Sequence, residues 1–425
     1  MSEPRGLLTG AIAAGVAGVM ADLLSPLYAT SFHRGFGLGN TQAGLLVTAA
    51  LGSMAVVEFG LARTIAQRNL KVVATYGIVI AALALLFISQ VSGRGLAAGF
   101  WPLLGGMVAL GLGCGLSFVA GNAALSYAHN GERAFGLLSS WYMVFVFVMM
   151  ATNPYLRQLY PIVLPYAAMI AVQLLCLVLI WWKLPDTRVI AAERAAAAAV
   201  VELRDPAVET VLRREAPHLK LFSTLPLVLG IAVGLSQLAV AGLWTFAEEM
   251  GTGSGLSAEV TASFLGFSQL IGLLGALAPW LLGRLVGRAV LGAAGFLLCG
   301  VGILVVALIQ EPAAFIVGNL VINLGYWATL PLTLSVASDL DRNSGRLVAF
   351  MLGMSSIGLA IGPSLAGPLL GGQDTTLGGW VFGILGLLAV PLIVPPARAA
   401  DHAARARAAE EAAEVSAGRG APGAV

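Results

Sequence analysis

Long apolar runs separated by short polar breaks recur along the whole chain. About 20 apolar residues in a helix span the ~30 Å hydrocarbon core of a bilayer, and most of the runs reach that length. The pattern therefore predicts twelve transmembrane helices. They are expected near residues 7–31, 41–62, 72–90, 100–128, 134–155, 161–183, 221–247, 258–282, 289–309, 313–337, 346–371 and 377–395.

The composition agrees with an all-α integral membrane protein. Of the 425 residues, 58% are hydrophobic and only 10% are charged, and the mean hydropathy is +0.90. A soluble domain carries about 25% charged residues, so the bilayer has to solvate most of this chain. The net charge of +2 indicates no nucleic-acid partner. We expect the protein to be a monomer. We also expect the first helix to be retained, because its apolar run is longer than the hydrophobic region of a signal peptide.

Basic residues fall almost entirely on one side of the predicted helices. With the N-terminus placed in the cytoplasm, only three of the 23 basic residues, Arg34, Arg94 and Arg157, lie on outer segments. Cytoplasmic loops of membrane proteins are enriched in Lys and Arg, so both termini are expected in the cytoplasm. The Arg- and Ala-rich composition is typical of a high-GC bacterium, and the inner membrane of a bacterium is the expected location.

The longest polar break divides the chain into two halves of six helices. The predicted units are 1–183, a cytoplasmic linker 184–220, 221–396, and a cytoplasmic tail 397–425 that is either helical or disordered. Short surface helices are expected in the linker, because Ala, Glu and Arg favour helix. The segment GLGNTQAG (37–44) opens the second helix and GLSAEVTA (255–262) opens the eighth. Such repeats indicate a duplicated architecture.

The six-plus-six arrangement and three short segments resemble the major facilitator superfamily. LPDTR (184–188) looks like the LPET segment after the sixth helix of many members, and GLGNTQAG is similar to their entry to the second helix. The run through Gly358, Gly362 and Gly367 is similar to the packing run of their eleventh helix, where glycines let helices approach closely. The resemblance implies two pseudo-symmetric six-helix bundles around a cavity lined by the first, fourth, seventh and tenth helices.

The loop after the second helix departs from the family signature Gly-x-x-x-Asp-Arg-x-Gly-Arg. Counted from Gly60, Thr64 stands at the acidic position and Ile65 at the first arginine, and only Arg68 is retained. In the second half, Arg284 keeps the end of the motif. The conformational latch that the motif provides in relatives is therefore altered. Signatures of drug–proton antiporters, peptide transporters and sugar porters are missing, so no subfamily is identified.

Asp22 lies near the middle of the first predicted helix. A carboxylate at that depth costs roughly 3 kcal/mol, so it should face a polar cavity or a partner. Apolar surroundings favour the protonated acid over the anion, which suits a group that carries a proton across the membrane. We therefore assign proton coupling to Asp22. The alternative is a structural carboxyl that is hydrogen-bonded to Asn or Ser on a neighbouring helix.

Glu58 lies about one turn inside the cytoplasmic end of the second helix. It is either a second proton site or an ion-pair partner that replaces the missing latch acid. The candidate gating or latch residues are Arg63, Arg68, Arg133, Arg284 and Arg346. At the outer end of the seventh helix, Glu248 and Glu249 are expected to be solvated, with a role in gating as the alternative.

Polar side chains form stripes on three other helices that the resemblance assigns to the cavity, because residues three, four and seven apart share a helix face. For the amide side chains, the alternative to substrate contact is interhelical hydrogen bonding. For the tryptophan, the alternative is anchoring at the membrane surface. The candidate substrate contacts are Asn122, Ser126, Gln237, Trp244, Asn319, Asn323 and Tyr326.

No pattern of enzyme chemistry is visible. The four His residues lie in different segments, and none forms a His-x-x-x-His pair. The chain has no GxxxxGK[ST] phosphate loop. We therefore expect no metal, no cofactor and no ATP hydrolysis.

The resulting hypothesis is a secondary active transporter that moves a small organic solute by alternating access, coupled to protons. No Arg or Lys lies in the middle of a helix, so neutral, amphipathic or cationic solutes are favoured over anions. The alternatives are a proton-driven efflux antiporter and a non-transporting sensor or assembly factor.

Overall fold

The computed structural model describes residues 6–61, 64–65, 68–93, 99–128, 131–160, 162–189, 223–340, 346–370 and 374–419. Within these ranges the chain is helical and holds no strand. Of the predicted linker 184–220, only residues 184–189 are described.

Eleven helices in the described ranges are long and apolar enough to cross a membrane. Each coincides with one of the predicted spans from the second onward, so those predictions are confirmed as helices. The helices that contain them are α4 (Asn40–Leu61), α5 (Leu70–Gly93), α6 (Phe100–Leu125), α7 (Gly131–Leu159), α8 (Val163–Lys183), α11 (Thr224–Thr245), α13 (Ala258–Val286), α14 (Arg288–Leu308), α15 (Pro312–Leu340), α16 (Arg346–Leu370) and α17 (Thr376–Arg419).

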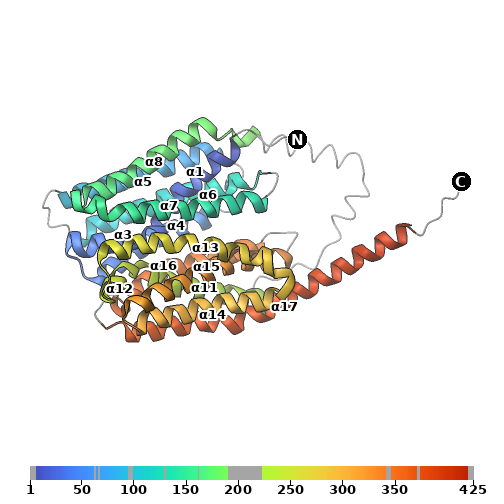
Figure 1. Ribbon diagram of the computed structural model, residues 1–425. Coiled ribbons are helices and arrows are strands. Elements are labelled where there is room, and N and C mark those ends of the chain that lie inside the picture. Colours follow the sequence, from blue (N-terminus) through green and yellow to red (C-terminus); the bar gives the residue numbers. More distant parts are fainter. Residues whose placement is uncertain are drawn as a thin grey trace.

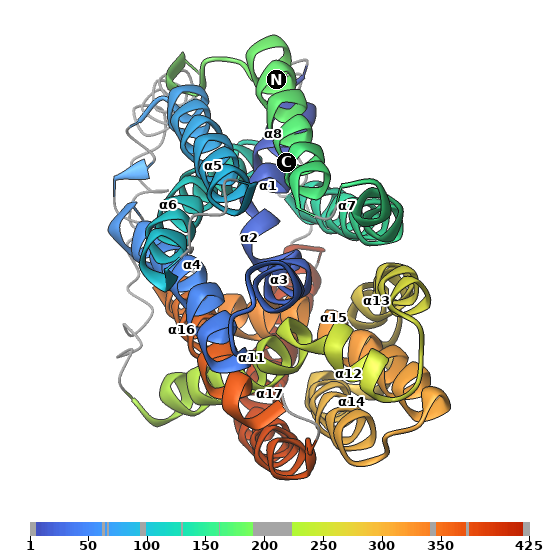
Figure 2. The same cartoon turned by 90° about the vertical axis from the view of Figure 1, so that its left-hand side faces the viewer.

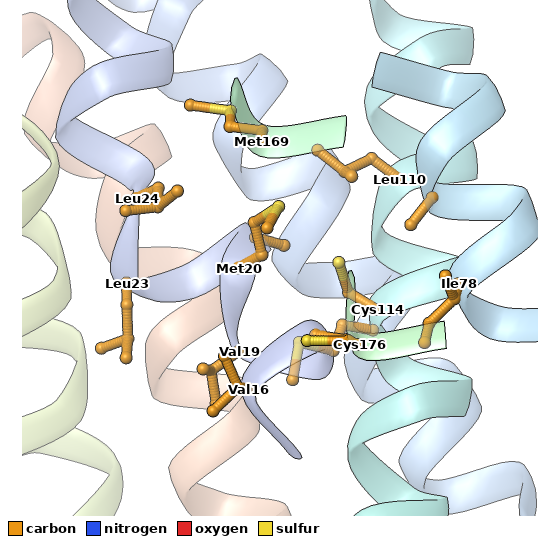
Figure 3. Close-up of a cluster of buried hydrophobic side chains, with 14 of the residues drawn as sticks. Val16, Val19, Met20, Leu23, Leu24, Ile78, Leu110, Cys114, Met169 and Cys176 are labelled. Carbon is orange, nitrogen blue, oxygen red and sulfur yellow. The ribbon is translucent and has the colours of Figure 1, made fainter. Parts of the chain in front are cut away.

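The first predicted span is not one continuous helix, and this expectation was wrong. It is broken into α1 (Leu7–Gly18), the four-residue α2 (Met20–Leu23), α3 (Ser25–Thr30) and the π-helix η1 (Ser31–Gly35). Pro26 explains the second break, at Leu24. In a regular helix the carbonyl of Asp22 would accept a hydrogen bond from the N–H of residue 26, and proline has no N–H. Figure 3 shows the broken segment against its own half: Met20 lies among Leu110, Cys114 and Met169, all buried.

A further break lies at the predicted end of the seventh span, and a short helix that was not predicted follows it. α11 ends at Thr245, Phe246 leaves helical geometry with φ −106° and ψ 13°, and α12 (Ala247–Gly253) follows. α3 packs against both α11 and α12. The two interruptions therefore lie close together, near the end of the molecule that points toward the viewer in Figure 2. We call this end the α3/α12 end.

The helices before residue 190 and those after residue 222 form two groups (Figure 1). We call α1–α8 the first-half helices and α11–α17 the second-half helices. The first-half helices bury one large apolar cluster, and the second-half helices supply nearly all of two further clusters. The most extensive packing between the groups joins α4 to α16 and α7 to α13.

Close packing of α16 confirms the expected role of its glycines. A methyl group added at Gly358 would lie 2.3 Å from the carbonyl oxygen of Gly234, and one at Gly362 would lie 2.5 Å from that of Leu238, both on α11. At Gly367 the same methyl would come within 2.6 Å of the Asn40 carbonyl oxygen on α4. α16 therefore contacts helices of both halves through glycines.

α17 continues well beyond the predicted end of the twelfth span. It runs to Arg419, so the tail is helical through that residue, and in Figure 1 it projects past the other helices. Asp401 ties the helix to its own half, because its Oδ2 accepts from the backbone N–H of Arg288 at 3.2 Å. The guanidinium of Arg288 also pairs with Asp339 on α15.

Candidate functional site

A small cavity of about 40 Å³ lies next to the two helix interruptions. Its wall comes from α2, α11, α13, α15 and α16. The lining residues are Asp22, Leu23, Val240, Ala241, Leu243, Trp244, Gln269, Asn319, Ile322, Asn323, Tyr326, Trp327 and Leu359. Five predicted site residues, from the first, seventh and tenth spans, are therefore brought together in one wall: Asp22, Trp244, Asn319, Asn323 and Tyr326.

Among the described residues of this wall, Asp22 brings the only carboxyl group. It lies on α2, between the two breaks, so its backbone position differs from that in a continuous helix. Among the described residues, none donates a hydrogen bond or forms a salt bridge to its carboxyl group. The Asn or Ser partner of the structural alternative is thus not found in the described part of the chain.

Trp244 links the two interruptions across the halves. Its indole N–H donates to the carbonyl oxygen of Leu23 at 3.2 Å. That carbonyl is available because the N–H of Leu27 bonds to Leu24 instead. Trp244 thus lines the cavity and also stabilises the broken backbone beside Asp22.

The amides of α15 make hydrogen bonds within the protein while they line the cavity. The side-chain nitrogen of Asn319 donates to the Phe315 carbonyl at 2.9 Å. The side-chain nitrogen of Asn323 donates to the Asn319 carbonyl at 2.9 Å and to the Ser268 hydroxyl on α13 at 3.3 Å. Substrate contact and interhelical hydrogen bonding, offered as alternatives by the sequence, are therefore compatible at Asn323.

Three predicted contact residues lie outside the cavity wall. Gln237 is buried beside the hydroxyl of Tyr326. Asn122 donates to the carbonyl of Phe118 on its own helix at 2.9 Å, and Ser126 is exposed. α6, the fourth span, supplies no residue to this wall, although the resemblance implied that it would.

Sequence reasoning missed Gln269 and Trp327, whose side chains meet in the wall. The indole N–H of Trp327 donates to Gln269 Oε1 at 3.2 Å, and both side chains are 5% exposed. The Ser-Gln pair in the middle of the eighth span was a usable signal, because intramembrane polar residues usually face a cavity or another helix.

Glu58 lies between the halves at the α4–α16 contact. The hydroxyl of Ser356 donates to its Oε2 at 2.5 Å. Glu58 is also within electrostatic range of Asp22. Ser356 is a partner that sequence reasoning did not identify.

The predicted latch arginines remain predictions. Arg63 lies outside the described residues, and the side chains of Arg133, Arg284 and Arg346 are not described either. Arg68 is described and exposed.

A buried ion pair closes the α3/α12 end, where solvated carboxylates were expected. Arg157 Nη1 of α7 lies 2.5 Å from Glu248 Oε1 of α12, and the Glu248 side chain is only 1% exposed. Arg157 Nη2 also donates to the Leu27 carbonyl on α3 at 3.4 Å. The expectation of solvation at Glu248 was wrong, because its partner lies 91 residues away in the sequence.

Glu249 next to this pair is partly buried. Burial raises the pKa of Glu249, and the neighbouring Glu248 carboxylate raises it further. His33 and Arg34 oppose both effects and lower that pKa.

The described part of the chain contains no cluster of three or more His, Cys, Asp or Glu side chains that could hold a metal ion.

The sequence matches the Major Facilitator Superfamily over residues 10–363. No curated protein sequence matches this chain. Solved structures with the same fold include a glutamate-to-glutamine mutant of the peptide transporter POT, with a TM-score of 0.66. The TM-score is 0.68 for the same mutant in complex with alafosfalin and 0.67 for its complex with sulfate.

Each of these structures is 15% identical to this chain, and each match covers 95% of this chain and 96% of the other. At that identity the likeness concerns the fold alone. The sequence match across most of the chain and the common fold show that this protein belongs to the major facilitator superfamily and is a multi-pass membrane transporter.

Proposed function

We propose that this secondary transporter is coupled to protons through Asp22. The single observation that carries the proposal is the carboxyl group of Asp22, which lines a cavity without a described partner. An unpaired anion there is costly, and protonation removes the cost. A carboxyl group that exchanges its proton with whichever side the cavity faces can couple solute movement to the proton gradient.

The proposed solute is small, organic, and neutral, amphipathic or cationic. No Arg, Lys or His is among the described residues that line the cavity, so these residues give an anionic solute no charge partner. The aromatic rings of Trp244, Tyr326 and Trp327 suit an apolar or ring-bearing solute.

Alternating access requires that the α3/α12 end opens in another state. We propose that α1 to η1 together form a twelfth, discontinuous span, and that residues 1–183 and 221–396 form two six-helix bundles that rock about the cavity. With both termini in the cytoplasm of a bacterium, the α3/α12 end faces outward from the inner membrane. The closed contacts at that end then correspond to a state that is shut to the outside.

The test is a pH-dye assay in proteoliposomes that hold the full-length protein, over a panel of neutral and cationic solutes. At least one solute should drive proton movement in the wild type, and Asp22→Asn should abolish that movement. Asp374→Asn is the matched control, because Asp374 is an exposed loop acid. Proton movement that persists unchanged in Asp22→Asn would refute the coupling role. A wild type that moves no protons with any solute would refute proton coupling.

A further inference from the structure

One hydrogen bond fixes the orientation of the Gln269 side-chain amide in the cavity wall. The indole N–H of Trp327 can only donate, so the atom that it reaches at 3.2 Å is the amide oxygen Oε1. The amide nitrogen Nε2 keeps its two N–H donors, and no residue in the described ranges accepts from it. Because Gln269 is only 5% exposed and lines the cavity, a ligand there that accepts a hydrogen bond would supply the missing partner.

Asn319 brings a second donor to the same wall. Its side-chain nitrogen uses one N–H on the Phe315 carbonyl at 2.9 Å, and an asparagine amide has two such groups. No described residue accepts from the other N–H or donates to the Oδ1 of Asn319. Asn319 is 1% exposed and lines the cavity. The wall therefore presents N–H donors from both α13 and α15.

Asn323 contributes an acceptor instead of a donor. Its two N–H groups are used on the Asn319 carbonyl and the Ser268 hydroxyl, so only its Oδ1 remains for a ligand. The wall thus combines donors on Gln269 and Asn319 with acceptors on Asn319 and Asn323. An uncharged group that uses both capacities has a carbonyl oxygen next to an N–H, as amides, lactams and ureas do.

The cavity has the size of such a group. Its volume is about 40 Å³, and one water takes about 10–15 Å³ of such space. The cavity therefore holds about three waters or a planar group of about four non-hydrogen atoms. Tyr326 and Trp327, with ring centroids 5.3 Å apart, and Trp244 border this space. Their rings suit a ligand whose polar group is attached to an apolar or aromatic part.

Charged groups match this wall less well than an uncharged amide. A carboxylate would accept from Gln269 and Asn319, but the described lining residues offer it no cation, and Asp22 would repel it when ionised. An ammonium group has no lone pair, so it would leave the N–H donors of Gln269 and Asn319 unpaired. An amide pairs with both donors and brings no charge into an apolar cavity.

We propose that Gln269 and Asn319 form a binding site for an uncharged carbonyl group of the solute, in an amide, lactam or urea with an apolar part. The carbonyl oxygen accepts from Gln269 Nε2 and from the remaining N–H of Asn319, and the N–H of the ligand donates to an amide oxygen of α15. This inference rests on the proposed function, because it takes the cavity as the solute site of the transporter, and it adds the substrate class.

The test is isothermal titration calorimetry on the purified full-length protein, with benzamide, phenylurea and ε-caprolactam as the uncharged probes. Benzylammonium, benzoate and α-methylstyrene are the matched ligands for benzamide. They carry a cation, an anion and no hydrogen-bonding group, respectively, on the same aromatic ring. We expect benzamide to bind about tenfold more tightly than each of the three.

Variants of Gln269 separate recognition from general effects on the fold. Gln269→Leu removes the donors, so the affinity for benzamide should fall about tenfold while that for α-methylstyrene stays unchanged. Gln269→Glu replaces the amide by a carboxylate that only accepts, so the preference should move from benzamide to benzylammonium. Gln173→Leu is the matched control, because Gln173 is a buried amide of α8 outside the cavity wall. It should keep the wild-type order of affinities.

The wild type alone can overturn the proposal, even if neither Gln269 variant folds. A matched ligand that binds as tightly as benzamide would do so, and so would a failure of all three uncharged probes to bind. A benzamide preference that Gln269→Leu retains would also overturn it. In each of these cases, solute-driven proton movement that depends on Asp22 would leave the proposed function standing. Conversely, amide-selective binding with proton movement unaffected by Asp22→Asn would refute the coupling and leave this site standing.

Discussion

Arg157 and Glu248 form an ion pair across the two halves of the molecule, with Nη1 and Oε1 2.5 Å apart. The pair joins α7 to α12, and the same guanidinium contacts the Leu27 carbonyl on α3. Three elements are thus held together at one end of the cavity. Opening of that end has to break these contacts.

Arg157→Gln or Glu248→Gln should shift the protein toward the state in which the α3/α12 end is open. Removing one partner leaves the other charge uncompensated, at a cost of about 3–5 kcal/mol for a buried pair. Spin labels at the exposed positions Tyr155 and Val260 would report the distance between α7 and α13. A longer distance is expected in both variants. The double variant that exchanges the two charges should restore the wild-type distance, and single variants that leave it unchanged would refute the gating role.

The same end should respond to pH through Glu249. Its pKa is raised by burial and by Glu248, so the closed arrangement prefers the protonated acid. The closed arrangement therefore loses stability as the pH rises from the ordinary carboxyl range through the raised pKa of Glu249. The label distance should lengthen over that window in the wild type and should respond less in Glu249→Gln. An identical pH response in both proteins would contradict the assignment.

Gln173 on α8 should stabilise the broken first helix. Its Nε2 donates to the Ala17 carbonyl at 3.1 Å, and the side chain is fully buried. Gln173→Leu leaves that carbonyl unpaired, at a cost of about 1–3 kcal/mol, so the thermal unfolding midpoint in detergent should fall. Ser140→Ala is the control, because its exposed hydroxyl bonds only within its own helix. A midpoint that falls equally in both variants would show that the Ala17 bond is not responsible.

Gly362→Val should disturb the packing of α16 on α11. The added Cβ would lie 2.5 Å from the Leu238 carbonyl oxygen and 2.8 Å from the Gly242 nitrogen. Overpacking of this kind costs about 1–3 kcal/mol, so the yield of monodisperse protein in detergent should drop. Gly52→Ala meets open space and should express as the wild type does. Normal yield of Gly362→Val would show that α16 can shift without loss.

Apolar run length was sufficient to predict the helices, because the bilayer imposes a minimum length that the sequence must meet. It could not reveal the breaks on either side of Asp22, since that segment stays largely apolar through them. The break at Phe246 coincides with the predicted end of the seventh span, just before Glu248 and Glu249. Pro26 was a local signal for the break at Leu24. At Phe246 the sequence carries no comparable residue.

The candidate site was predictable where a residue was unusual for its depth, and this holds for Asp22 and for the amides of α15. Contacts between distant segments were not predictable. Glu248 is buried because Arg157 reaches it from α7, and Glu58 meets Ser356 because α4 packs on α16. Both partners become neighbours only when the two halves pack together.

The most direct test of the central claim is an infrared difference spectrum of the protein between acidic and alkaline pH. A protonated carboxyl group has a C=O stretching band distinct from the amide bands, and the band disappears on ionisation. The wild type and Asp374→Asn should show a band that Asp22→Asn lacks. Identical spectra for the wild type and Asp22→Asn would contradict the account, because Asp22 would then carry no exchangeable proton.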